Sequence, residues 1–169
     1  MNTDRKLYKK YLDLAKEQFD KSDSSKQSSK YISEHRKVYL INCLILIELA
    51  LESFINDFGY TYVINYEYLE RISIKNRLII LPKISKYHSK EILHEKDPLY
   101  QTLNTLIKYR NIFVHRDAEE RLDKAFDRVN HSLVNEFYMA TIELFKLYNK
   151  HFNIFKDDNY LNNAQQSWL

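Results

Sequence analysis

Glycine, proline and cysteine are all scarce in this chain, and each scarcity excludes a class of protein. One glycine and two prolines mark few tight turns or strand ends, which favours long helices over a β fold. One glycine also cannot build a glycine-rich phosphate-binding loop. The single cysteine, Cys43, excludes a disulfide framework and a cysteine-based metal site. It lies within an apolar run, so we expect it to be a small core residue.

The sequence also shows no N-terminal signal sequence and no long uninterrupted apolar run. Its most apolar stretch, Val38–Leu51, is interrupted by Asn42 and Glu48 and is shorter than the roughly 20 residues that a membrane span requires. We therefore expect a buried helix here, and a soluble, cytoplasmic protein without a membrane partner.

What the chain does contain is an apolar content of 44%, enough for a sizeable core, and a mild net charge of +3. This charge is lower than that of a wholly basic nucleic-acid coat protein. The basic residues gather locally, however, since Arg71–Lys96 holds seven Lys or Arg and only two Glu. This stretch either faces phosphates or forms a solvated helix face.

Apolar periodicity predicts an all-α protein, an up-and-down bundle of four to five helices. We expect one domain over residues 1–155 and a polar tail over 156–169, with Trp168 near its end. The expected long helices are about Asp4–Phe19, Tyr31–Phe58, Pro98–Val114 and Ala118–Phe152.

Local signals support several of these boundaries. Gly59 follows the last periodic residue of the second helix, where a C-terminal cap is expected. Asp97 and Pro98 are typical of a helix start, and Asp117 with Glu120 resembles a capping box. Residues 60–97 are less regular. We expect a short helix in "NYEYLERI" and another in "IKNRLIILPKISKYH", the second bent or interrupted near Pro82.

Arg110 is the most unusual residue of the expected helix Pro98–Val114, because it falls in the middle of the apolar face. Burying a permanent cation is costly unless it is paired. Either Arg110 has an internal carboxylate partner, with Glu48 first and Glu52 next, or it lines a cleft or subunit interface that binds an anion. Asn111 and His115 stand together on the flank, four residues apart.

The segment Arg110–His115, "RNIFVH", resembles the R-x(4–6)-H motif of HEPN domains, in the frequent form with Asn after Arg. The approach to it from Ser73 and the preceding helix Leu46–Phe58 are also similar, so the resemblance covers about residues 35–150. It implies a helical domain that dimerises with two motifs facing each other. Many such domains are metal-independent endoribonucleases of toxin–antitoxin, antiviral defence or RNA-processing systems. One subgroup has a modified tyrosine two residues after the histidine, where this chain has Asp117.

The resemblance and the chemistry together predict roles for individual residues, without a cofactor or metal. Arg110 would bind the scissile phosphate, His115 from each protomer would act as base or acid, and Asn111 would orient one of them. The expected products are a 2′,3′-cyclic phosphate and a 5′-hydroxyl. The remaining candidate residues are Arg116, Lys108 and Tyr109 for RNA binding, and Glu48 and Glu52 in support. A homodimer is expected, together with an antitoxin or defence-system partner protein.

Two other interpretations remain open. A HEPN-like domain can bind RNA or dimerise without cutting, dependent on a partner. Alternatively, the chain is a helical structural protein in which Arg110 is paired with Glu48. The other histidines show no metal-ligand pattern. The 14 tyrosines could stack on bases, but such residues more often pack in the core and at its rim.

Overall fold

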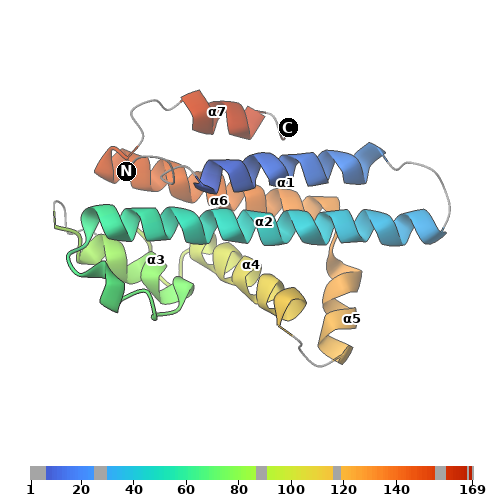
Figure 1. Ribbon diagram of the computed structural model, residues 1–169, viewed down its shortest axis with the longest axis horizontal. Helices are drawn as coiled ribbons and strands as arrows, with labels where there is room; N and C mark the ends of the chain where they lie inside the picture. The colour runs from blue at the N-terminus through green and yellow to red at the C-terminus, as the bar shows by residue number, and fades with distance from the viewer. Residues whose placement is uncertain are drawn as a thin grey trace.

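The computed structural model describes residues 7–24, 30–86, 91–115, 119–154, 159–166 and 168. These residues contain seven α-helices, one 3-10 turn and no strand, so the prediction of an all-α protein is confirmed (Figure 1). The bounds are α1 Leu7–Ser24, α2 Lys30–Tyr62, η1 Tyr66–Tyr68, α3 Ile74–Lys83, α4 Pro98–Val114, α5 Glu119–Arg128, α6 His131–Phe152 and α7 Asn159–Gln166. The expected four to five helices were too few.

The long helix α2 is the centre of the bundle, with α1 lying along it and α6 packed against it (Figure 1). α3 and α4 lie on the side of α2 away from α1 and α7. Much of the core is aromatic. The ring of Phe54 stacks on Phe145 at 4.0 Å between centroids, and Phe58 meets the edge of Tyr148 at 4.8 Å. Cys43 is fully buried, as predicted.

Gly59 does not cap α2, and the sequence prediction for this position was wrong. The helix continues to Tyr62, and the described glycine has no positive φ. A Cβ atom at position 59 would instead overlap the ring of Tyr66, which folds back against the helix from η1. Glycine is required here for close packing rather than for a left-handed backbone.

The predicted bounds of helix Pro98–Val114 are confirmed by α4. Pro98 occupies the first turn, where its missing N–H costs nothing. Asp97 stands at the N-cap, although its carboxylate accepts a hydrogen bond from the His94 backbone N–H at 2.6 Å rather than from the first turn of α4. At the other end, His115 has extended backbone angles and its N–H still donates to the Asn111 carbonyl.

The predicted helix Ala118–Phe152 was wrong, because the chain breaks between α5 and α6. Asn130 is extended, and its side-chain oxygen accepts a hydrogen bond from the Leu133 N–H at 2.9 Å. This cap starts a new helix, and α5 points away from the axis of α6 (Figure 1). The expected capping box involves Asp117, which lies outside the described residues.

Helix α7 occupies the region that was expected to be a polar tail, and the sequence analysis did not predict it. It packs against α6 through Leu161, which is buried. Trp168 stacks on Tyr138 with 3.8 Å between ring centroids, and the Tyr138 hydroxyl donates to the Ala164 carbonyl. These contacts attach the C-terminal segment to the bundle.

By length and composition, the part of α2 between Glu34 and Tyr62 is apolar enough to cross a membrane. Half of its most apolar window is buried inside the protein, and core helices of soluble proteins share these properties.

Candidate functional site

Three side chains of the HEPN-like motif come together at the C-terminal end of α4. Arg110 Nη1 lies 3.1 Å from His115 Nε2 and donates to Asn111 Oδ1 at 3.2 Å. His115 and Asn111 are exposed, whereas the Arg110 side chain is 21% exposed. The end of α4 lies on the side of the molecule away from α1 and α7 (Figure 1).

The contact between Arg110 and His115 determines which atom accepts the hydrogen bond. A guanidinium group only donates hydrogen bonds, so Nε2 is the acceptor in this contact, as in the tautomer that carries its proton on Nδ1. A neutral imidazole can take a proton, as a general base must. The lone pair that would do so faces Arg110, so the arginine must move before Nε2 can reach a substrate.

Arg110 also has an internal partner, which was one of the two alternatives for this residue. Its Nε lies 3.3 Å from Glu48 Oε2, and the Glu48 side chain is only 3% exposed. Burial raises the pKa of the Glu48 carboxyl to about 7; Arg110 opposes this shift, Glu52 adds to it and Arg77 opposes it. Arg110 therefore links a buried carboxyl group of α2 to a surface histidine.

Glu52, the second expected partner of Arg110, pairs with a different arginine. Arg77 Nη2 of α3 lies 3.2 Å from Glu52 Oε1. Arg77 is buried and also donates to the Tyr66 hydroxyl at 2.8 Å and, at close range, to Asn56 Oδ1. The Tyr66 hydroxyl in turn donates to Asn56. Two arginine–glutamate pairs therefore lie one helical turn apart along α2.

Sequence reasoning missed Arg77, which it counted only within the basic stretch. The signal was nevertheless present. Arg77 lies between Ile74, Leu78 and Leu81 at the spacing of one helix face, and all three are buried. The argument that selected Arg110 on α4 applies equally to Arg77 on α3.

The candidate RNA-binding residues are only partly available. Lys108 is exposed, but Tyr109 is half-buried, with its ring 5.8 Å from Phe137 and 6.2 Å from Phe113. Its aromatic faces therefore pack against the core more than they offer a surface for a base. Arg116 lies outside the described residues.

The basic stretch 71–96 does not form one open cationic surface. Arg77 is buried, and Lys83 Nζ lies 2.6 Å from Glu91 Oε1. Arg71, Lys75 and Lys96 are exposed. Lys86 is exposed as well, so the exposed cations of this stretch are spread along its described residues.

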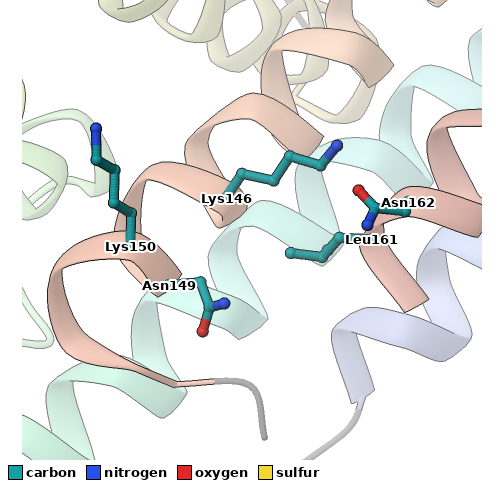
Figure 2. Close-up of a pocket in the computed structure, with 5 residues that line it drawn as sticks. All are labelled: Lys146, Asn149, Lys150, Leu161 and Asn162. Atoms are coloured by element: carbon teal, nitrogen blue, oxygen red, sulfur yellow. The ribbon is translucent and has the colours of Figure 1, made fainter. Parts of the chain in front are cut away.

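A cavity of about 330 Å³ lies elsewhere, between α6 and α7, lined by Lys146, Asn149, Lys150, Leu161 and Asn162 (Figure 2). Lys146 donates to Gln165 at 2.5 Å. Figure 2 shows that the ammonium groups of Lys146 and Lys150 point away from one another, so they do not converge on a single anion. Within the described part of the chain, no three His, Cys, Asp or Glu side chains are placed to hold a metal ion.

Comparison with known proteins leaves the motif and its geometry as the basis for assigning a function. The chain matches no protein-family model, no curated protein and no solved structure.

Proposed function

We propose that this protein is a metal-independent endoribonuclease of the HEPN type, with a composite active site at a homodimer interface. The observation that carries the proposal is the contact between Arg110 and His115 at the exposed end of α4. A permanent cation, a neutral imidazole and the amide of Asn111 stand within one small surface cluster. These are the groups that RNA cleavage through the 2′-hydroxyl requires.

The reaction proceeds by attack of the 2′-oxygen on the adjacent phosphorus. One neutral His115 removes the 2′-hydroxyl proton, and the His115 of the second protomer, protonated by solvent beforehand, donates a proton from its imidazolium form to the departing 5′-oxygen. Arg110 turns from His115 to the phosphate, which frees Nε2 and places a bidentate cation on the developing negative charge. The P–O5′ bond breaks, leaving a 2′,3′-cyclic phosphate and a 5′-hydroxyl.

Dimerisation follows from the same chemistry, since one histidine cannot easily lie on both sides of an in-line displacement. A two-fold axis near the end of α4 supplies the second histidine. Val114, on the apolar side of α4 next to His115, is 46% exposed. Its exposure supports an interface at this position.

The protein's cellular setting is part of the proposal. The resemblance suggests a toxin–antitoxin or antiviral defence system, with an antitoxin or another protein as partner, and the cytoplasm remains the expected location from the sequence. RNA is the substrate, and no cofactor is used.

One observation favours a second function, that of a HEPN-like subunit that binds RNA without cutting it. Arg110 is occupied by Glu48 and by His115 in this structure. A subunit in which these contacts persist would hold RNA through Lys108 and neighbouring cations and would leave cleavage to a partner.

RNA cleavage in EDTA tests the proposal, with wild type beside His115→Ala and with the product ends analysed. We expect wild type to leave cyclic phosphates and the variant to lose at least about a hundredfold in rate. The exposed Lys124, which pairs with Glu120 on α5, offers Lys124→Ala as a matched control that should retain activity. Absence of cleavage by wild type on a broad panel of RNAs would favour the non-cleaving subunit.

A further inference from the structure

The ion pair between Glu48 and Arg110 is close but poorly bonded. Glu48 Oε2 and Arg110 Nε are 3.3 Å apart, yet both are buried atoms without a hydrogen-bond partner among the described residues. A buried carboxylate is stable only when good geometry and additional hydrogen bonds compensate for its lost hydration. At Oε2 the attraction between the charges acts without such a hydrogen bond, so the ionised form of Glu48 is incompletely compensated at this oxygen.

The groups around Glu48 make its charge depend on what Arg110 does. From α2, Glu52 brings a second negative charge one turn away; from α3, Arg77 is already bonded to Glu52, Asn56 and the Tyr66 hydroxyl of η1. From α4 come Arg110 and, beyond it, His115. Arg77 is therefore paired with Glu52, and among the described residues Arg110 is the cation in ion-pair contact with Glu48.

An anion bound to Arg110 would place a second negative charge on the guanidinium that compensates Glu48. An ionised Glu48 would then oppose the binding, and a protonated Glu48 would not. We propose that Glu48 takes up a proton when a phosphate or sulfate group binds Arg110. Ionised Glu48 then holds Arg110 in an internally paired form, and protonated Glu48 leaves Arg110 in an anion-binding form. This rests on the proposed function only in assigning Arg110 as the phosphate ligand.

The pKa of Glu48, raised by burial to about 7, agrees with this geometry because both charge states are then accessible near neutral pH. The direction of the effect follows from linkage. Anion binding stabilises the protonated form and raises the pKa further, so the affinity for the anion must fall as pH rises through this range. His115 would produce a similar trend, since it also lies beside Arg110, and an experiment must separate the two.

Sulfate is a suitable probe because it remains a dianion over the whole pH range. The backbone amide shifts of Asn111 and residue 115 report its binding by NMR at constant ionic strength, in the full chain carrying His115→Gln. We expect sulfate to bind roughly tenfold more tightly at about pH 6 than at about pH 8.5, as one unit of pKa shift implies. In His115→Gln with Glu48→Gln, we expect the tight value at both pH values.

Glu52→Gln provides a matched control on the same helix. Because the Glu52 charge raises the pKa of Glu48, this variant should keep the pH dependence but shift its midpoint to lower pH. The ¹³C carboxyl resonance of Glu48 in the otherwise unaltered protein gives a second measurement that needs no substitution. Its titration midpoint should move to higher pH when sulfate is added.

The proposal would be overturned if the sulfate affinity of the His115→Gln protein did not depend on pH. It would also be overturned if the titration midpoint of the Glu48 carboxyl did not move when sulfate is added. Failure of sulfate to bind at either pH would also overturn it. RNA cleavage is not used in any of these measurements. A protein that shows the linkage but cuts no RNA would therefore refute the proposed function and leave this inference standing.

Discussion

Arg110 can combine a structural role with the proposed functional one, because different atoms of its side chain face the two sides. Nε faces the buried Glu48, while Nη1 faces the exposed Asn111 and His115. The planar guanidinium can do this because its donors point in fixed, divergent directions, which an ammonium group cannot reproduce. The two alternatives that the sequence left open for Arg110 are therefore compatible.

Arg110→Ala should destabilise the protein in a pH-dependent way. The folded-state pKa of Glu48 is raised from 4.5 to about 7, so its stabilising contribution is complete below about 4.5 and is lost as pH rises through the folded value. Removing Arg110 raises that pKa further and extends the loss. We expect a small effect near pH 6 and a loss of about 2 kcal/mol in the free energy of unfolding near pH 8.5, because each pH unit above the folded pKa adds at most about 1.4 kcal/mol.

Urea unfolding at the two pH values measures this difference. The double variant Arg110→Ala with Glu48→Gln removes the orphaned carboxylate and should show no such pH dependence. An equal loss at both pH values in the single variant would mean that the ionisation of Glu48 is not involved.

Some helix boundaries of this protein are determined by local sequence signals, and others by tertiary contacts. α4 begins and ends where its residues alone indicate, with Pro98 at its start and His115 leaving helical geometry at its end. α2 runs through its glycine because Tyr66 packs against that position. The break between α5 and α6 follows from the Asn130 cap, whose side chain competes with helix continuation.

Asn130→Ala tests the cap at the start of α6. Loss of the hydrogen bond to Leu133 N–H should lower the free energy of unfolding by about 1 kcal/mol, measured by chemical denaturation. Asn163→Ala, an exposed position within α7, is a matched control and should change stability by less than about 0.5 kcal/mol. Equal losses for the two variants would show that the cap contributes nothing specific.

At the scale of the whole molecule, two arginine–glutamate pairs connect α2 to α3 and α2 to α4. Both pairs start from α2, at Glu48 and Glu52, and end on different helices. Both pairs reach solvent in part, through Glu52, which is 35% exposed, and through Arg110, which is 21% exposed. The Arg110 pair is the one that contacts the exposed His115, and this is the pair that the proposed enzyme would use.

The proposed dimer brings two copies of Arg110 together across its axis, where they repel until an anion binds. Sulfate or an RNA fragment should therefore lower the dimer dissociation constant, by about tenfold or more, in sedimentation experiments at matched ionic strength. Arg110→Gln removes the repulsion and should make the dimer insensitive to sulfate. If the dimer dissociation constant of the wild-type protein did not change with sulfate, this would argue against a dimer in which the two Arg110–His115 motifs face each other.

Much of the candidate site was predictable because its members lie within six residues. Arg110, Asn111 and His115 share one helix end, and helical spacing places Asn111 and His115 on one flank. The contact between Arg110 and His115 spans five residues and forms where His115 leaves helical geometry. Glu48 was also expected, since it borders the apolar face of its helix. The pairing of Glu52 with Arg77 was not, because it depends on how α3 packs against α2, which the spacing along either helix does not reveal.

The sequence by itself determined the helical class, the bounds of α4 and the placing of Arg110 on an apolar face, because these depend on residues three or four apart. Only the tertiary structure decided that Gly59 lies inside a helix, that Arg77 is buried with Glu52, and that Arg110 is paired inwards to Glu48. These features join segments about 7 to 62 residues apart, as Gly59 to Tyr66 and Glu48 to Arg110 show. Such contacts exist only once the helices have packed and shared burial has selected their partners.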